Sequence, residues 1–194
     1  MVISYTASDC SLHALERLNQ NFEEDLIETI QMHVNENTSG CIGCGKCWKK
    51  QKCVFEEDGV NEALDKMKVC DAVIVLSDLY YGHVHRALSD FMRRTVNCGS
   101  LILNNLPCAF IPCAGKRKHE EAVKEIESFF RYADMLVIAA KHDHAISGDV
   151  DQDNHVIDSL CARIRWLMQC AEAAREAEIE KPRDLYKREL DYIR

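Results

Sequence analysis

Segments that favour strands alternate with segments that favour helices along the whole chain. The clearest strand is the uninterrupted apolar run at 72–76, which suits a strand that helices cover on both faces. The predicted strands lie at 2–7, 25–34, 71–77, 108–113 and 134–140, and the predicted helices near 9–18, 60–67, 85–95, 120–133 and 155–174. This alternation indicates an α/β fold with a doubly wound, five-stranded parallel sheet, commonly in the strand order 2-1-3-4-5.

Composition limits the classes of protein to which the chain can belong. At 194 residues and 47% hydrophobic, it can form one domain, predicted at 1–172, followed by a charged tail at 173–194. The start of the chain lacks a secretory pattern and no apolar run is long enough for a membrane span, so we expect a cytoplasmic protein without a membrane partner. A net charge of −8 disfavours nucleic acid as a partner.

A long connection follows the second predicted strand, at 35–58, and it contains four closely spaced cysteines. The stretch CIGCGKCWKKQKC places them at Cys41, Cys44, Cys47 and Cys53. In a reducing compartment such a set points to a cofactor or to redox chemistry rather than to disulfides. A C-x2-C-x2-C run can wrap three corners of an iron–sulfur cube, and Cys53 can supply the fourth thiolate. Zinc and free or redox-switching thiols are the alternatives.

Three loops are expected to meet at the carboxyl ends of the strands, where such sheets bind ligands. The first, at 6–11, offers hydroxyls and backbone N–H groups at a helix start, which suits a phosphate, although Asp9 would repel that anion. The second, at 77–83, presents adjacent tyrosines and a glycine to a flat heterocycle. The third, at 112–118, is small and then basic. Each loop also has an alternative role without a ligand: a helix cap for the first, two core tyrosines for the second and a solvated turn for the third.

Read together, these motifs resemble the iron–sulfur flavoprotein branch of the NADPH-dependent FMN reductase family, which has a flavodoxin-like fold. CIGCGKCWKKQKCVFEEDGV is similar to the compact cysteine motif of that branch. SDLYYGHVHRALSDFMRRT resembles the loop that holds the flavin ring and the helix after it, and GDVDQDNHVIDSLCARIRWL resembles the lead into the last helix. The likeness covers about residues 1–170. Asp78 stands where the family usually has proline, and the first loop lacks the family's arginine.

The resemblance implies FMN and a 4Fe–4S cluster as cofactors. The four cysteines would bind the cluster, and no catalytic acid or base is implied because the chemistry belongs to the flavin ring. The implied flavin contacts are Thr6, Ser8, Cys10 and Ser11 at the phosphate, Leu79, Tyr80, Tyr81, Gly82 and His83 at the ring, and Ala114, Gly115 and Lys116 in the third loop. Members of the family form homodimers or homotetramers, so we expect the same here.

The expected function is FMN-dependent electron transfer between the flavin and the cluster, with NAD(P)H or a ferredoxin-type protein as the redox partner. Two alternatives stay open at this point. One is an FMN-only NAD(P)H-dependent reductase of quinones or flavins. The other is a domain without enzymatic activity, in which the cysteine loop senses redox state or metal.

Overall fold

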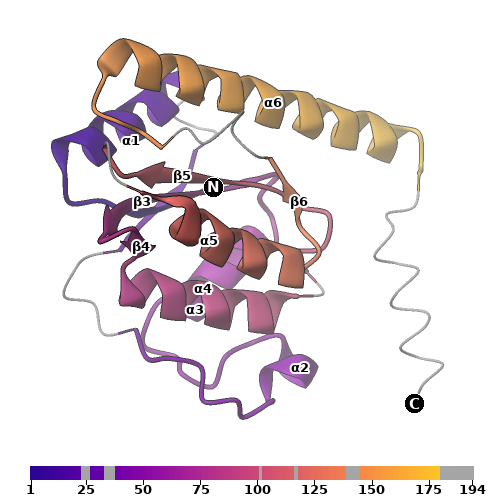
Figure 1. Cartoon of the computed structure of the whole chain (residues 1–194). Helices are drawn as coiled ribbons and strands as arrows, with labels where there is room; N and C mark the ends of the chain where they lie inside the picture. Colours follow the sequence, from indigo (N-terminus) through magenta and orange to yellow (C-terminus); the bar gives the residue numbers. More distant parts are fainter. Residues whose placement is uncertain (23–26, 33–37, 101, 116–117, 139–144, 180–194) are drawn as a thin grey trace.

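A parallel sheet forms the centre of the molecule in the computed structural model, which describes residues 1–22, 27–32, 38–100, 102–115, 118–138 and 145–179 (Figure 1). Its strands are β1 (Val2–Tyr5), β2 (Thr29–Met32), β3 (Val73–Tyr80), β5 (Pro107–Cys113) and β6 (Leu136–Val137). They lie in the order β2-β1-β3-β5-β6, and the short β4 (His83–Val84) pairs antiparallel with the end of β3. With β4 set aside, this is the predicted order 2-1-3-4-5, and the fold class is confirmed.

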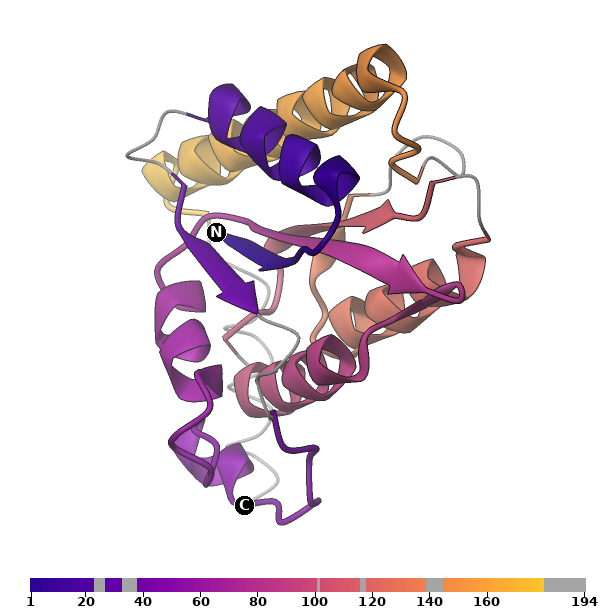
Figure 2. The ribbon, with the colours of Figure 1, turned by 90° about the vertical axis from the view of Figure 1, so that its left-hand side faces the viewer.

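Helices cover both faces of the sheet (Figures 1 and 2). On one face lie α1 (Asp9–Asn21) and α6 (Val150–Glu176), and on the other lie α3 (Val60–Met67), α4 (Arg86–Gly99) and α5 (Glu120–Tyr132). Successive side chains of β3 point to opposite faces, so Val75 packs with the α3–α5 layer while Leu76 packs with the α1–α6 layer. Both layers are apolar, which explains why the β3 sequence shows no polar alternation.

The segment after the apolar run of β3 differs from the prediction. Residues 77–83 were expected to form a loop, but β3 continues to Tyr80 and turns back into β4. Tyr80 pairs with His83 across a two-residue turn. Tyr81 and Gly82 have φ angles of 53° and 87°, and a hairpin turn with two positive φ angles matches the right-handed twist of the strands. Tyrosine at the first of these positions is a weak turn signal, so the sequence did not indicate the hairpin.

Parallel pairing brings the predicted ligand loops to one edge of the sheet. Tyr5 at the end of β1 lies opposite Ser77, and Asp78 lies opposite Cys113 at the end of β5. The loops that leave these three strands therefore start side by side, as expected for the carboxyl edge of a doubly wound sheet.

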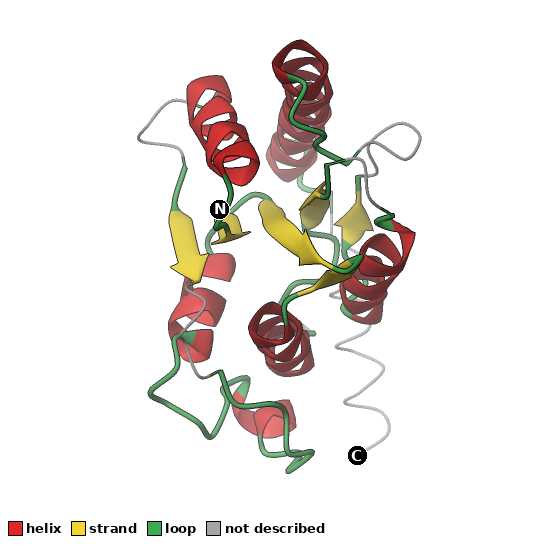
Figure 3. Cartoon of the chain, turned by 60° about the vertical axis from the view of Figure 1, so that its left-hand side comes forward, coloured by secondary structure: helices red, strands yellow, loops and turns green. Residues whose placement is uncertain are grey.

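The cysteine-containing connection lies on the far side of the α3–α5 layer. It includes the short helix α2 (Cys47–Lys50), which packs against α4, well away from α1 and α6 (Figure 3). The insertion is thus placed after β2, as predicted, and α4 separates it from the sheet. The same helix begins next to the β3–β4 hairpin, so α4 links the two candidate sites.

The closing helix α6 continues past the predicted domain end at residue 172. Its last buried residue is Ile164, and Arg175 forms an exposed ion pair with Asp71 at 3.3 Å.

Within the described residues, no helix is both long enough and apolar enough to span a membrane.

We expect a chain that ends at residue 172 to keep the folded core. The deletion removes no buried side chain of α6 and one exposed ion pair, which contributes at most about 1 kcal/mol. For a chain of this size, that corresponds to a fall in Tm of roughly 2–4 °C. Thermal unfolding followed by circular dichroism measures the change. An insoluble product would show instead that the removed segment is needed for folding or assembly.

Candidate functional site

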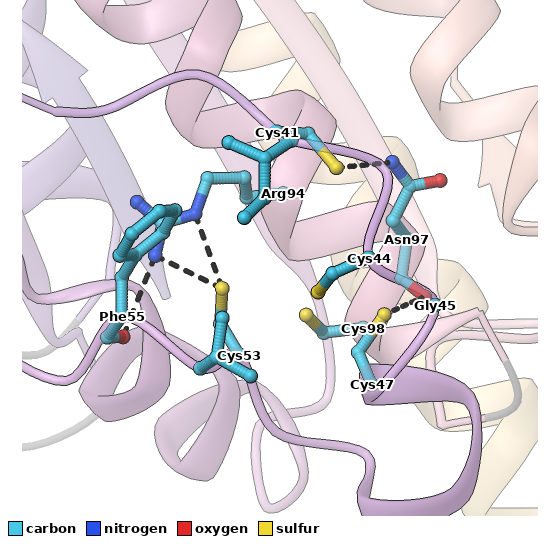
Figure 4. A pocket seen from close by; sticks show the side chains of 11 residues that line it. Cys41, Cys44, Gly45, Cys47, Cys53, Phe55, Arg94, Asn97 and Cys98 are labelled. Carbon is cyan, nitrogen blue, oxygen red and sulfur yellow. Dashed lines mark hydrogen bonds between the residues drawn. The ribbon is translucent and has the colours of Figure 1, made fainter.

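The four predicted ligand cysteines lie around one hollow between the insertion and α4 (Figure 4). The hollow holds about 340 Å³, counting the space open to solvent. Cys41 and Cys44 are exposed, whereas Cys47 and Cys53 are half-buried against the apolar layer. Apolar walls come from Ile42, Val54 and Phe55. The sequence prediction that these thiols converge on one place is therefore consistent with the fold of the insertion.

Two glycines allow the insertion to wrap around the hollow. Gly43 and Gly45 both have a φ angle of 66°, in the left-handed region that side chains disfavour. A Cβ at either position would meet no heavy atom within 4 Å. The requirement for glycine is thus one of backbone conformation and not of space, and it gives the C-x2-C-x2-C run its two tight turns.

Arg94 of α4 ties the insertion to the domain. Its side chain is 1% exposed. Its Nε and Nη2 donate to the sulfur of Cys53 at 3.3 and 3.1 Å, and it is paired with the Asp58 carboxylate. Further donations reach the carbonyl oxygens of Ser39 at 3.1 Å and Phe55 at 3.4 Å. Burial opposes the charged guanidinium, but its hydrogen bonds to Asp58 and Cys53 outweigh that effect and raise the pKa of Arg94.

Two further residues of α4 contact the cysteines. Asn97 donates through Nδ2 to the sulfur of Cys41, and its carbonyl oxygen accepts from the thiol of Cys47, both at 3.7 Å. Cys98 is a fifth thiol on the hollow (Figure 4). Burial, and then the neighbouring Cys47 and Cys53 thiols, raise the pKa of Cys98. The thiol of Cys98 thus lies within hydrogen-bonding reach of the Cys47 and Cys53 thiols.

Four cysteine thiols on one hollow are a donor set for either of two kinds of metal group. Four thiolates around a single zinc lie about 4 Å apart, because each Zn–S bond is about 2.3 Å and the geometry is tetrahedral. A cube of iron and sulfide binds each of four thiolates at a different iron. The four cysteine thiols that line the hollow are thus a set of donors that fits a cluster.

The first strand-end loop forms the start of α1. Ser8 is the N-cap, and it forms a capping box with Ser11 at N3. Thr6 is half-buried, and its hydroxyl has no hydrogen-bond partner among the described residues. Asp9 is exposed in the first turn. The alternative reading of this loop as a helix cap is thus correct for Ser8.

Asp78 places its carboxylate within this first loop. One oxygen accepts from the backbone N–H groups of Ala7 at 2.6 Å and Ser8 at 2.9 Å, and from the Ser11 hydroxyl at 2.8 Å. The other accepts from the Ser8 hydroxyl at 2.5 Å. Asp78, rather than Asp9, is therefore the carboxylate that opposes an anion here, and the expectation for Asp9 is corrected. A phosphate would need these same donors, so the loop as it stands does not fit the phosphate of FMN.

Aromatic side chains surround the β3–β4 hairpin. The rings of Tyr5 and His85 stack at 4.7 Å, and Tyr80 lies edge-on to both. Burial raises the pKa of Tyr5 to about 12, with a further contribution from Tyr80. Tyr81 at the turn is 97% exposed. The hairpin thus offers exposed aromatic surface to a flat ring.

The remaining predicted flavin contacts are divided between the core and the surface. Leu79 is buried in β3, and His83 is exposed in β4. The third loop begins with buried Ala114 and Gly115, whose φ angle is 62°. Lys116 lies outside the described residues. The described residues of this set, from Leu79 to Gly115, follow or end the strands β3 and β5, beside the first loop.

Cys10, predicted at the phosphate, has a different neighbour. The thiol of Cys113 at the end of β5 lies beside it and lowers the pKa of Cys10. The same contact, followed by burial, raises the pKa of Cys113 well above its ordinary value. The first and third loops thus meet through a pair of thiols.

The residues that sequence reasoning missed are Asp58, Asp78, Arg94, Asn97 and Cys98. Arg94 did carry a signal, because it lies three residues after Phe91 and four before Cys98, on the apolar stripe of an amphipathic helix. A charge on such a stripe requires a buried partner. Asp78 was noted only as a departure from the usual proline, and its contact to a loop 70 residues away had no sequence signal.

Comparison with known proteins agrees with this architecture. The model of the NADPH-dependent FMN reductase family matches residues 4–143. The chain belongs to the NADPH-dependent FMN reductase family.

Among curated proteins, the chain is 30% identical over 126 residues to an iron–sulfur flavoprotein of Methanocaldococcus jannaschii, covering 63% of this chain and 65% of that protein. It is 27% identical over 108 residues to an iron–sulfur flavoprotein of Methanosarcina thermophila, covering 54% of this chain and 56% of that protein. The matches thus span less than two thirds of the length of these relatives.

Solved structures support the fold alone. A flavodoxin of Bacillus cereus superposes with a TM-score of 0.55 at 10% identity, covering 84% of this chain and 96% of that chain. The fold is therefore flavodoxin-like, as the sequence predicted.

Proposed function

We propose that this chain is an iron–sulfur flavoprotein, which transfers electrons between a flavin at the strand ends and a 4Fe–4S cluster at Cys41, Cys44, Cys47 and Cys53. The observation that carries the proposal is the single hollow lined by these four thiols and closed by α4. Membership of a flavin-reductase family and the likeness to two iron–sulfur flavoproteins support it.

This chain's own residues would bind and tune the two groups. The cluster would supply one-electron transfer and the flavin two-electron transfer when bound. Around the hollow, Arg94 and Asn97 donate to cysteine sulfurs, and such hydrogen bonds are among the factors that set the potential of a cluster. The half-buried Phe55 would shield one side of the cluster from water. At the hairpin, Tyr80 and Tyr81 would lie against the flavin ring.

The separation of the two sites bears on how electrons would pass. Residues 94–98 lie 8 to 12 positions beyond the start of α4 at Arg86, which is roughly 12–18 Å along the helix axis. We propose a homodimer or homotetramer in which the cluster of one subunit approaches the flavin of another. Exposed apolar side chains near both sites support this assembly, namely Ile42, Trp48 and Tyr81.

The redox partner is proposed to be NAD(P)H or a ferredoxin-type protein. The family name supports the nicotinamide donor, and the exposed rim of the cluster hollow at Cys41 and Cys44 supports a protein partner that exchanges single electrons. Anaerobic stopped-flow mixing with each donor separates the two.

Chemical analysis of anaerobically purified protein tests the proposal directly. We expect about four iron and four acid-labile sulfide per chain, with the broad visible absorption of iron–thiolate bonds. Free cysteine counted under denaturing conditions, before and after iron removal, provides a second measure. Stoichiometric zinc without sulfide would contradict the cluster and favour the FMN-only reductase.

A further inference from the structure

The buried carboxylate of Asp78 occupies the position at the start of α1 where a phosphate would bind. Four donors of the first loop converge on it, from two backbone N–H groups and the hydroxyls of Ser8 and Ser11. A carboxylate offers about four acceptor sites, so this set nearly saturates its two oxygens. Asp78 is 8% exposed, which makes the contact part of the folded loop rather than a surface arrangement.

A second anion cannot share these donors without a large penalty. A phosphate ester carries about −1.5 to −2 charge at neutral pH. Seating it on Ala7, Ser8 and Ser11 would either displace the Asp78 carboxylate or hold two like charges side by side in a water-poor site. Displacement would leave that carboxylate buried without partners, because its hydrogen bonds all come from the same loop.

The part of the site that would hold a flavin ring carries no such conflict. The hairpin tip is exposed at Tyr80 and Tyr81, and the turn at Gly82 approaches the Lys118 carbonyl, which a Cβ would meet at 3.2 Å. The hydroxyl of Thr6 is buried without a partner among the described residues, and a sugar-chain hydroxyl of a ligand would satisfy it. The ring and its chain can therefore bind while the phosphate position is closed.

We propose that Asp78 determines the specificity of the flavin site, so that the site binds flavins without favouring the 5′-phosphate. Riboflavin and FMN then bind with similar affinity, and Asp78 is the reason. This inference rests on the flavin half of the proposed function and goes beyond it, because it concerns which flavin the site selects.

The test compares wild type with Asp78→Asn and Asp78→Ala. Dissociation constants for FMN and for riboflavin come from the quenching of flavin fluorescence, and inorganic phosphate serves as a competitor. In wild type we expect the two constants to agree within about threefold and phosphate to have no effect. In both variants FMN binding should tighten about tenfold or more, riboflavin binding should stay within about twofold, and phosphate should compete with FMN.

Asp9→Asn is the matched control, because it removes the same charge from the same end of α1 at an exposed position. Its two constants should change less than about twofold. A readout without flavin comes from thermal unfolding, in which inorganic phosphate should raise the Tm of Asp78→Ala by mass action but not that of wild type. Asp78→Ala also covers the case in which Asp78→Asn fails to fold.

Two results would overturn the inference. Wild type that binds FMN about tenfold more tightly than riboflavin would show that the phosphate has a place despite Asp78, while leaving the proposed function intact. Binding of neither flavin by wild type or by the folded variants would instead overturn the flavin half of the proposed function, and the inference with it.

Discussion

Cys44→Ser protein, purified without oxygen, is expected to lose most of its iron and acid-labile sulfide and to keep its flavodoxin-like fold. Cys44 is an exposed member of the C-x2-C-x2-C run on the rim of the hollow, so the fold does not depend on its packing. Serine is a poor substitute for a soft thiolate ligand, and the loss of one of four ligands exposes an iron. Iron and sulfide content should fall by about fivefold or more.

Flavin binding should be unaffected by the same change, because the strand-end loops lie at the opposite end of α4 from the hollow. Reduction of the flavin by a chemical donor should persist, while transfer to a one-electron acceptor should slow by about tenfold or more. Flavin fluorescence and anaerobic stopped-flow absorption measure the two steps separately.

Two further variants test whether the loss of iron and sulfide is specific to Cys44. Cys170→Ser is the control, because Cys170 is also exposed but lies on α6, on the other face of the sheet. It should leave iron, sulfide and flavin unchanged. Cys98 lies on the same hollow, so its thiol is placed to substitute for a lost ligand. Cys44→Ser combined with Cys98→Ser excludes that rescue. Full retention of iron and sulfide in the double variant would refute the assignment of Cys44 as a ligand.

The order of strands and helices could be predicted because it depends on local patterns. Runs of apolar residues indicated β3 and β5, and apolar residues at helical spacing indicated α3 and α4. The meeting of three loops at one edge followed from the rule that parallel strands present their carboxyl ends together. The convergence of the four cysteines followed from their short spacing, which confines them to one small region.

Contacts between distant segments could not be predicted in this way. The carboxylate of Asp78 reaches the first loop only because β1 and β3 are neighbours in register, and nothing near Asp78 in sequence marks its partner. Asp9 lies inside that loop and was therefore given the role that Asp78 fills, although it points to solvent. The hairpin of β4 was missed for a different reason, since Tyr81 adopts a positive φ angle that side chains rarely accept.

Contacts between distant segments also build the cysteine site, as the fully buried Arg94 shows. The insertion carries the thiols, but α4 holds them in place, and the two segments are separated by about 40 residues of sequence. Its partners Ser39, Cys53, Phe55 and Asp58 all belong to the insertion. One guanidinium thus fastens both ends of the cysteine loop to the domain, which explains why an arginine is buried on an otherwise apolar stripe.

Arg94→Gln is therefore expected to destabilise the protein and to loosen its hold on iron. Glutamine is shorter, uncharged and has fewer donors, so it leaves the half-buried Asp58 carboxylate without its partner. Breaking a fully buried pair typically costs about 3–5 kcal/mol, and we expect the lower value here because Asp58 is half-buried, so the Tm should fall by roughly 6–12 °C. Thermal unfolding and the rate of iron release to a chelator measure the two effects.

The matched control for this change is Arg93→Gln. Arg93 is the neighbouring arginine of the same helix, but it is exposed. Its replacement should change the free energy of unfolding by no more than about 0.5 kcal/mol. Arg94→Lys keeps the charge without the planar fork of donors, so it should fall between wild type and Arg94→Gln.

The reduction potential of the cluster distinguishes a tuning role for Arg94 from a purely structural one. Hydrogen bonds to cluster sulfurs stabilise the more negative, reduced state, and Arg94 supplies two to the sulfur of Cys53. Variants that retain the cluster should therefore show a lower potential in an anaerobic redox titration, with Arg94→Gln lower than Arg94→Lys. A potential equal to that of Arg93→Gln, together with an unchanged Tm, would mean that other contacts hold the insertion and that the guanidinium neither fastens nor tunes the thiolates.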